Sequence, residues 1–388
     1  MIDEFTFSTT ASFVFGKPVA DYLKDTLARR QLSRILIVTD SGIVKVGLLD
    51  STLQIFNKSS VSLTVFDKVE ADPADSTIIE AVSLARKNNV ELIVGFGGGS
   101  SMDVAKLVAV LAHPNSHCDL SSCYGVDQIN QPRLPLIQVP TTAGTGSEVT
   151  PISIVTTGGS TKAGVVSAVL QPDIAILDPS LTTGLPPDIT AATGIDAMVH
   201  AIEAFTSKVK KNIYSDMLAT KALSLLIANI SLAVNQGDNV EARGNMLLGA
   251  MLAGQAFANA PVAGVHALAY PLGGHFHIPH GLSNALMLPH VLRFNLSAAS
   301  DLYAQLAPIV CPNLATDLSN KDKALALIET LEKLISDLGL QTKLRQCGVS
   351  QDSLEMLADE SMLQQRLLIN NPVKIERNDA LNLYRAAY

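Results

Sequence analysis

The chain has 388 residues, of which 47% are hydrophobic and 16% are charged, and its formal net charge is −8. A chain of this length usually forms two or three domains, and the apolar content is enough for large cores. The negative charge and the lack of any run of lysines and arginines argue against nucleic acid or an anionic membrane as the main partner, and favour a small molecule.

The N-terminus, MIDEFTFSTTASFVFG, lacks the positively charged start and apolar core of a secretory signal. No stretch approaches the roughly 18 uninterrupted apolar residues of a membrane helix. The cysteine spacings match neither a zinc site nor a C-x-x-C redox pair. We therefore expect a cytoplasmic protein with four free thiols, at Cys118, Cys123, Cys311 and Cys347.

The first part of the chain alternates short β-branched runs with helical patterns. Strands are predicted over 35–39, 61–66, 91–96, 134–139 and 174–177, and helices over 18–30, 43–57, 74–88 and 101–112. Nearly continuous apolar strands indicate a parallel sheet that is covered on both faces, and the alternation is typical of βαβ units. Residues 1–185 are therefore predicted to form an α/β domain that binds a nucleotide at its strand ends.

A glycine-rich turn follows the predicted strand 91–96, in the segment ELIVGFGGGSSMDVAK. Gly97, Gly98, Gly99 and Ser100 lead into a helix, where glycines let the backbone approach a pyrophosphate and the helix N-terminus offers unpaired N–H groups. Ser100 departs from the G-x-G-x-x-G fingerprint counted from Gly95, which requires glycine there. Similar turns also occur for packing alone.

A second polar loop, VPTTAGTGSEVT, follows the predicted strand 134–139. The hydroxyls of Thr141, Thr142 and Thr145 can hold phosphate or ribose oxygens, although turn formation explains them equally well. Asp40, after the strand 35–39, is placed to accept hydrogen bonds from ribose hydroxyls, and its charge would repel the extra phosphate of NADP. The pattern favours NAD, with Lys162 either near the nicotinamide end or an ordinary solvated loop lysine.

From about residue 188 onward the periodicity is almost wholly helical. Pro186 and Pro187 mark the boundary, and residues 186–388 are predicted to form an all-α domain that carries metal and substrate, facing the strand ends across a cleft. Examples of the predicted helices are 212–235, 242–258, 321–339 and 351–368.

Four residues of this second part have the spacing of a divalent metal site. Asp196 and His200 share one face of a helix at i,i+4. His266 and His280 flank a segment that we expect to be broken, so that the imidazoles approach from different elements. The expected helix breakers are Pro271, Gly273, Gly274, Pro279 and Gly281.

The donor types at these positions favour particular metals. One carboxylate and three imidazoles suit Fe²⁺ or Zn²⁺ better than Ca²⁺ or Mg²⁺. Any one of the four, taken alone, is more often a structural residue than a ligand. However, five of the eight histidines lie between 200 and 280, and an unpaired imidazole is costly to bury.

Together these segments resemble the iron-containing (group III) alcohol dehydrogenase family over nearly the whole chain. The resemblance is carried by GGGSSMDVAK, PTTAGTGSEVT, STKAG before LQPDIAILDP, ATGIDAMVHAIEAF, GVHALAYPLGGHFHIPHG and NDALNLYRAAY. It implies a dehydroquinate synthase-like architecture: a Rossmann-like N-terminal domain, a helical C-terminal domain, NAD(P), a divalent metal and a homo-oligomer, often a homodimer.

The resemblance also implies roles for individual residues. It assigns the metal to Asp196, His200, His266 and His280. It assigns cofactor contacts to Asp40, the Gly98–Ser101 turn including Ser101, Thr141, Thr142, Thr145 and Lys162.

One position departs from the family pattern. Many members carry histidine four residues after the third metal ligand, where this chain has Tyr270. A phenol with a pKa of about 10 is a poor proton acceptor at neutral pH, although it can donate and accept hydrogen bonds. The predicted reaction is hydride transfer between NAD and a small primary alcohol or its aldehyde, with Tyr270 and Lys162 as candidate catalytic residues.

Two alternative functions remain open. A lyase resembling dehydroquinate synthase would share the NAD, the metal and the two domains, but it would need several Lys and Arg residues for a carboxylated, phosphorylated substrate. The ligand segments are poor in them. A non-catalytic NAD-binding regulator is the other alternative, and it would tolerate the loss of an open metal position. No residue identifies the alcohol or the physiological direction.

Overall fold

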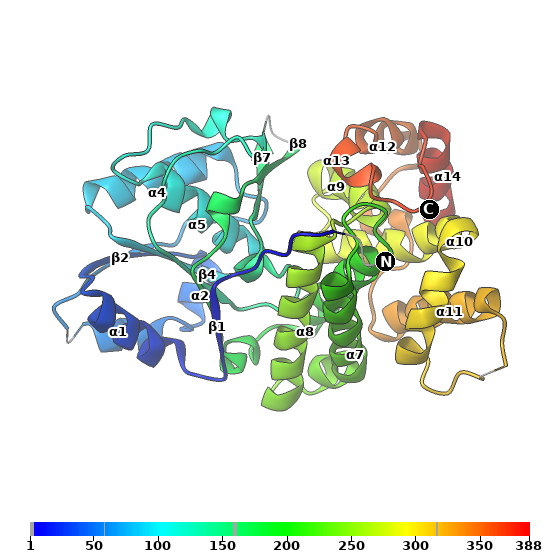
Figure 1. Cartoon of the computed structure of the whole chain (residues 1–388), viewed down its shortest axis with the longest axis horizontal. Coiled ribbons are helices and arrows are strands. Elements are labelled where there is room, and N and C mark those ends of the chain that lie inside the picture. The colour runs from blue at the N-terminus through cyan, green and yellow to red at the C-terminus, as the bar shows by residue number, and fades with distance from the viewer. Residues whose placement is uncertain (1–3, 58, 158–160, 316) are drawn as a thin grey trace. The chain divides into compact units, whose positions relative to one another are not determined.

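The structure is a computed structural model that describes residues 4–57, 59–157, 161–315 and 317–388. The chain divides into two compact units. We call Thr9–Thr142 with Gly146–Thr183 the sheet unit, and Gly184–Tyr388 with Met1–Ser8 and Ala143–Thr145 the helical unit. Figure 1 shows the ribbon with its elements labelled.

The sheet unit is built on a parallel sheet in the order β1-β9-β6-β4-β2-β3. Its Val- and Ile-rich central strands β2 and β4 are almost wholly buried, as expected of strands that are covered on both faces. The predicted parallel α/β architecture is confirmed. The strands are β1 (Ser12–Phe15), β2 (Arg34–Val38), β3 (Ser62–Phe66), β4 (Leu92–Gly97), β6 (Leu136–Pro140) and β9 (Ile174–Leu177).

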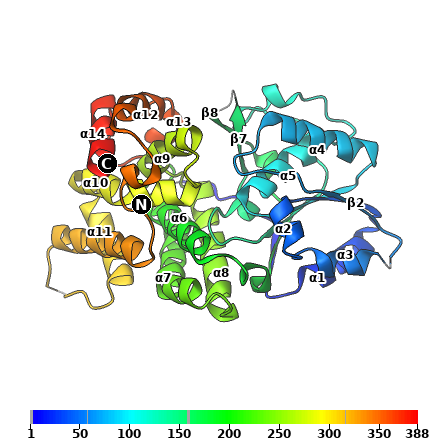
Figure 2. The ribbon, with the colours of Figure 1, turned by 180° about the vertical axis from the view of Figure 1, so that it is seen from behind.

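Two hydrophobic clusters cover the two faces of this sheet, because successive strand residues point to opposite sides. Leu36 and Ile93 pack on one side with residues of α4 and α5. Ile35 and Leu92 pack on the other with residues of α1 and α3. Figure 2 shows these helices, which are α1 (Val19–Arg30), α2 (Ser41–Lys45), α3 (Asp50–Phe56), α4 (Asp75–Lys87) and α5 (Gly99–Leu111).

Two features of the sheet unit differ from prediction. The single helix expected over 43–57 is divided into α2 and α3, because the chain turns at Gly47, whose φ is +73°. A small second sheet, in the order β5-β8-β7, was not predicted because its strands mix polar and apolar residues without a clear period. Its strands are β5 (Gly125–Val126), β7 (Ile152–Thr157) and β8 (Thr161–Val166).

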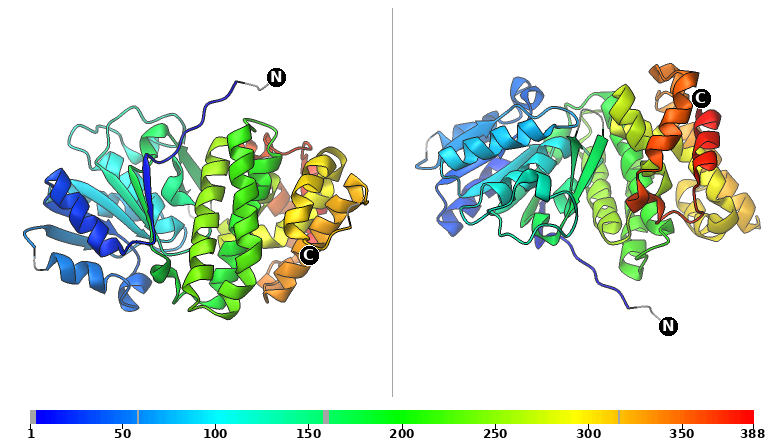
Figure 3. Two further views of the ribbon diagram at one scale, coloured as in Figure 1. Left: turned by 60° about the horizontal axis from the view of Figure 1, so that its bottom comes forward. Right: turned by 90° about the horizontal axis from the view of Figure 1, so that it is seen from above.

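The helical unit is organised around α6, which is buried along most of its length and packs against α7, α8 and α10. The helix predicted over 351–368 is broken into η6 (Gln351–Ser353), α12 and α13, with a turn between the last two. Figure 3 shows the unit from two further sides. Its helices are α6 (Pro187–Thr206), α7 (Ile213–Asn235), α8 (Val240–Asn259), α9 (Gly264–Phe276), α10 (His280–Val310), α11 (Asn320–Asp337), α12 (Leu354–Ser361), α13 (Gln365–Leu368) and α14 (Arg377–Ala387).

Helix α7 is long and apolar enough to cross a membrane by length and composition alone, and α8 with α9, bent by 107°, would pass the same test as a pair. The buried residues of α7 recur every three to four positions, as in Ala219, Leu223, Leu226 and Ile230. This stripe packs against α6 and α8. Packing within the helical unit therefore accounts for this stripe, whereas Ile213, Met217 and Leu232 of α7 are exposed.

Candidate metal centre and nucleotide-binding turn

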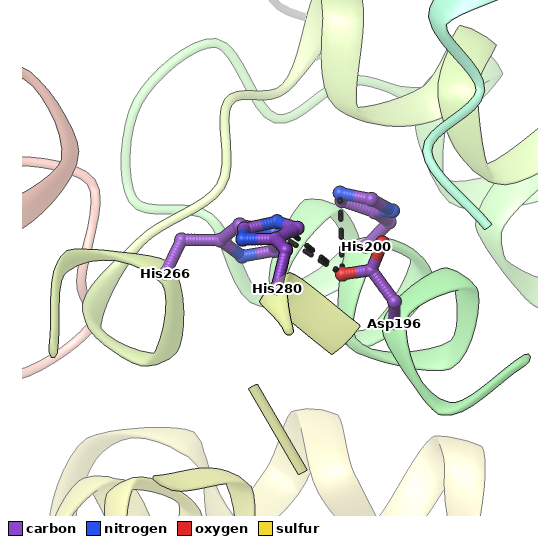
Figure 4. A group of neighbouring side chains, drawn as sticks. All are labelled: Asp196, His200, His266 and His280. Carbon is purple, nitrogen blue, oxygen red and sulfur yellow. Dashed lines mark ion pairs between the residues drawn. The ribbon is translucent and has the colours of Figure 1, made fainter. Parts of the chain in front are cut away.

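Four side chains of the helical unit bring one potential ligand atom each to within 4.8 Å of one another: those of Asp196, His200, His266 and His280. Asp196 Oδ1 lies 3.9 Å from His200 Nε2, 3.8 Å from His266 Nε2 and 3.6 Å from His280 Nε2. Figure 4 shows the three imidazoles around this carboxylate. Residues from three helices thus converge on one point.

The local structure explains this convergence. Asp196 and His200 are one turn apart on α6, His266 lies in the first turn of α9, and His280 is the first residue of α10. The chain reverses between α9 and α10, where His277 has a left-handed φ of 54°. The two imidazoles therefore come from different elements, as predicted.

The expected cause of that break is partly wrong. Pro271, Gly273 and Gly274 lie inside α9, and Gly281 lies inside α10; only Pro279 stands at the break, as the N-cap of α10. Gly281 instead permits close packing, because an added Cβ would lie 2.3 Å from the carbonyl oxygen of Ala192 on α6. This contact brings the start of α10 against the helix that carries Asp196.

Burial and the neighbouring groups together set the ionisation of Asp196 and His200. Asp196, His200 and His266 are buried, whereas the His280 side chain is 38% exposed, so the cluster opens on the His280 side. Burial lowers the pKa of His200 to about 3, which keeps this imidazole neutral with a lone pair to donate. Burial also raises the pKa of Asp196, but the neighbouring histidines and a hydrogen bond from Asn284 outweigh this effect, and the pKa lies below its usual value.

The donor set fits a divalent ion. An ionised carboxylate and neutral imidazoles are the ligand forms that metals such as Fe²⁺ and Zn²⁺ require. The buried Asn284 donates from Nδ2 to Asp196 Oδ1 at 2.6 Å, which orients this carboxylate. Sequence reasoning missed Asn284, although its position four residues after His280 on α10 was an available signal.

The glycine-rich turn in the sheet unit has the expected form. Strand β4 ends at Gly97, Gly98 is the N-cap, and α5 begins at Gly99, followed by Ser100. Gly97 has a φ of +152°, and an added Cβ would lie 2.7 Å from Ser101 Oγ. Only glycine fits there, and the first N–H groups of α5 are left for another partner.

Other predicted cofactor residues lie at this turn. The Thr141 N–H donates to the Gly97 carbonyl oxygen at 3.0 Å, and a Cβ on Gly98 would lie 3.6 Å from Thr142 Oγ1. A Cβ on Gly97 would lie 3.5 Å from Asp40 Oδ2. The ends of β2, β4 and β6 therefore bring Asp40, the glycines, Ser101 and the two threonines together.

The remaining candidates lie elsewhere. Thr145 belongs to the helical unit. Lys162 is a residue of β8, not a solvated loop lysine: its largely buried side chain pairs with Asp72 and donates to Thr156 Oγ1 at 3.2 Å. The Tyr270 ring centroid lies 5.9 Å from that of His280, so this phenol is a neighbour of the metal cluster.

Sequence reasoning also missed a buried ionic network behind the second polar loop. Lys106 is fully buried on α5, and its Nζ donates to Ser147 Oγ at 2.7 Å and to the Ile152 carbonyl at 2.6 Å. Asp103 Oδ1 accepts from Ser147 Oγ at 2.6 Å. These contacts fix residues 147–152 against α5, and the available signal was a D-x-x-K pair on a largely apolar helix.

The sheet unit carries a glycine-rich turn of the kind that binds phosphate, and the helical unit carries a carboxylate-imidazole cluster. Together they define a class of proteins that bind a nucleotide and a metal ion. Residues 10–179 match the family described as "Iron-containing alcohol dehydrogenase", and residues 190–388 match "Fe-containing alcohol dehydrogenase family, C-terminal". The chain belongs to the iron-containing alcohol dehydrogenase family. This membership favours the oxidoreductase prediction over the lyase and the regulator.

Individual relatives match this chain over almost its full length. Long-chain-alcohol dehydrogenase 1 of Geobacillus thermodenitrificans is 40% identical over 96% of this chain and 94% of its own. A crystal structure of 1,3-propanediol oxidoreductase has a TM-score of 0.94 at 34% identity, and the match covers 100% of both chains. Sulfoacetaldehyde reductase from Bifidobacterium kashiwanohense, in complex with NAD⁺, has a TM-score of 0.87 at 30% identity over 99% of both chains.

Proposed function

We propose that this protein is a metal-dependent alcohol dehydrogenase that transfers a hydride between a small primary alcohol, or its aldehyde, and NAD. The observation that carries the proposal is the convergence of the buried Asp196, His200 and His266 with the partly exposed His280. The glycine-rich turn at Gly97, between β4 and α5, supports the proposal that the cofactor is NAD.

Each group of residues has a distinct task in this reaction. The carboxylate and the three imidazoles hold the divalent ion, and when bound this ion polarises an alcohol or aldehyde oxygen. NAD supplies the hydride acceptor or donor. The exposed side of the cluster, at His280, is where we propose that the substrate oxygen enters. The neighbouring Tyr270 hydroxyl can donate or accept a hydrogen bond there.

Fe²⁺ is the ion that we propose, with Zn²⁺ as the alternative, because the donor set suits either and the family is iron-containing. We propose NAD rather than NADP because the Asp40 carboxylate lies at the turn and would repel a 2′-phosphate. The cofactor contacts of Gly98, Gly99, Ser100, Ser101, Thr141, Thr142, Thr145 and Lys162 remain part of this proposal. For Lys162, a role near the nicotinamide requires release from Asp72.

The substrate class rests on the relatives. Their names include a long-chain alcohol, a short diol and sulfoacetaldehyde. The diol carries primary hydroxyls, and sulfoacetaldehyde carries an aldehyde. We therefore propose that the chemistry at the reacting carbon is shared, and that a small primary alcohol is the substrate here.

We also propose a cytoplasmic homodimer with domains at 1–185 and 186–388. Support for the dimer comes from β1, an edge strand whose Phe13 and Phe15 are 49% and 43% exposed, since such an edge can pair with a second chain. Support for the division comes from the two compact units. The free state of all four cysteines agrees with a reducing compartment.

The test is to measure metal content and NADH production in the same preparations. Protein loaded anaerobically with Fe²⁺ or Zn²⁺ is assayed with NAD⁺ and a series of primary alcohols of increasing chain length. Replacing His266 by Ala is expected to abolish metal retention and turnover together, because one of four ligands is lost. Full activity in a His266→Ala protein without bound metal would refute the proposal.

A further inference from the structure

A carboxylate outside the four-residue cluster contacts one of its imidazoles. Glu203 Oε2 lies 2.7 Å from His266 Nδ1, and the two side chains are 4% and 2% exposed. On the opposite edge of the same ring, Nε2 faces Asp196. The His266 ring is therefore held between two carboxylates, with one nitrogen toward each.

The hydrogen bonds to Glu203 determine which nitrogen carries the proton. Its Oε1 accepts from the Val265 N–H at 2.6 Å, and its Oε2 accepts from the Ala263 N–H at 2.9 Å. As a carboxylate, Glu203 can only accept hydrogen bonds, and His266 Nδ1 is then its donor. The ring is then the tautomer with its proton on Nδ1 and a lone pair on Nε2, the atom that faces the cluster and lies 3.2 Å from Asn284 Nδ2.

Glu203 also fixes the backbone that carries His266. Ala263 is the N-cap of α9 and makes no side-chain cap of its own, so Glu203 satisfies the N–H groups of Ala263 and Val265 from another helix. Its negative charge is favourable at a helix N-terminus. One side chain therefore orients the ring and the helix start together.

The position of Glu203 in the sequence links it to the other ligands. It lies seven residues after Asp196 and three after His200, so the three share one face of α6. This face supplies two potential ligands directly and orients a third, which belongs to α9.

We propose that Glu203 is a positioning residue of the metal centre: it holds His266 with Nδ1 protonated and Nε2 directed at the ion. The inference rests on the proposed metal centre and goes beyond its four ligands. In metalloproteins generally, loss of a carboxylate that orients a ligating histidine lowers metal affinity by about 10–100-fold.

The informative variant is Glu203→Gln, which preserves shape. A glutamine amide has one acceptor atom in place of two, so it cannot accept from Val265, Ala263 and His266 as the carboxylate does. We expect the Zn²⁺ dissociation constant, measured by chelator competition, to rise by about 10–100-fold. We also expect the visible absorption of the Co²⁺-loaded protein to shift, because His266 is no longer held in one orientation.

The matched control is Asn370→Ala. Asn370 Nδ2 donates to the Val262 carbonyl at 2.9 Å, so it supports the same loop without contacting a ligand. We expect this variant to lose stability in urea unfolding of the metal-free protein while Zn²⁺ affinity stays at the wild-type value. If Glu203→Gln binds Zn²⁺ as tightly as the wild type, or if both variants weaken binding equally, the positioning role is wrong.

A measurement on the wild type protects the test against misfolding of the variant. In ¹⁵N NMR of the Zn²⁺-loaded protein with labelled histidines, we expect His266 Nδ1 to be protonated and Nε2 to be metal-bound. Binding through Nδ1 would overturn the inference. If His266→Ala retained Zn²⁺, the proposed metal centre itself would be wrong. If His266→Ala lost Zn²⁺ but Glu203→Gln kept the wild-type Zn²⁺ affinity, only the role of Glu203 would be wrong.

Discussion

Burial shifts the pKa of ionisable side chains in this protein, and the direction of the shift depends on the type of group. Burial keeps His200 neutral by lowering its pKa to about 3, which suits a metal ligand. Burial raises the pKa of Glu148, in the polar loop of the sheet unit, to about 7. The same physical cause, the cost of burying charge, therefore favours the neutral form of an imidazole at one place and of a carboxyl at another.

Glu148 leads to a prediction for the pH dependence of stability. Its pKa rises from 4.5 to about 7 on folding, so the folded state retains a proton that the unfolded chain releases. The stabilisation is complete below pH 4.5 and is lost as the pH rises through about 7. Urea unfolding of the wild type and of Glu148→Gln, which is neutral at every pH, should show the wild type losing stability relative to the variant across this range.

The pKa of the neighbouring Lys106 shifts in the opposite direction, because burial lowers it from 10.5 to about 8. Lys106 therefore titrates above the pH range of this experiment. The comparison with Glu148→Gln leaves Lys106 in place in both proteins. Parallel stability curves for wild type and variant between pH 4.5 and 7 would show that Glu148 titrates normally in the folded protein.

At the residue scale, spacing in the sequence identified the four residues of the candidate metal cluster but not the residues that support them. Asp196 and His200 are recognisable because helical periodicity places them on one face. Glu203 lies on the same face, yet a glutamate on a helix is usually solvated. Its burial is visible only once α9 is packed against it.

At the scale of elements, close approach between helices decides whether the metal ligands meet. The start of α10 packs on α6, where a Cβ at position 281 would be 2.3 Å from the Ala192 carbonyl oxygen. A backbone oxygen cannot move aside as a flexible side chain does. The distance between Asp196 and His280 therefore depends on a residue that has no side chain.

This packing predicts the effect of Gly281→Ala. The added methyl group should separate α10 from α6 and reduce stability by about 1–3 kcal/mol, as overpacking does generally. Because His280 begins α10, Zn²⁺ affinity should fall as well. Chelator competition and urea unfolding measure the two effects.

Gly184→Ala is the matched control, because an added Cβ there meets no atom within 4 Å. It should leave both stability and Zn²⁺ affinity close to those of the wild type. A Gly281→Ala protein that behaved in the same way as this control would contradict the packing argument.

Element prediction from the sequence succeeded where the periodicity was strong and failed where single residues intervened. The strands β2, β4 and β9 were predicted because β-branched runs are distinctive. The division of 43–57 depended on the turn at Gly47, and the continuity of α9 through Pro271 depended on its packing. Proline and glycine shift a local preference, and tertiary contacts of larger energy can override it.

At the scale of the whole molecule, the two proposed ligands should stabilise mainly different units. The metal ligands all belong to the helical unit, and the glycine-rich turn belongs to the sheet unit. A ligand at 100 times its dissociation constant stabilises the state that binds it by about 2.7 kcal/mol. The stabilisation should be concentrated in the elements that make the contacts.

Hydrogen exchange measured by mass spectrometry can test this division. Zn²⁺ added to the metal-free protein should slow exchange in α6, α9 and the start of α10. NAD⁺ alone should slow exchange at the turn between β4 and α5 and around Thr141. The effect of Zn²⁺ should vanish in His266→Ala. Uniform protection of both units by either ligand would contradict the separate assignment.

The sequence by itself determined the parallel α/β unit, the helical unit and the four candidate ligands, because periodicity and spacing are local properties of the chain. Only the tertiary structure decided which side chains support the site. Glu203, Asn284 and Lys106 acquire their roles from partners that lie 41 to 88 positions away in the chain. Burial by such distant partners turns ordinary polar residues into fixed hydrogen-bonding groups, and a local spacing such as i,i+4 or D-x-x-K does not by itself show which residues are buried.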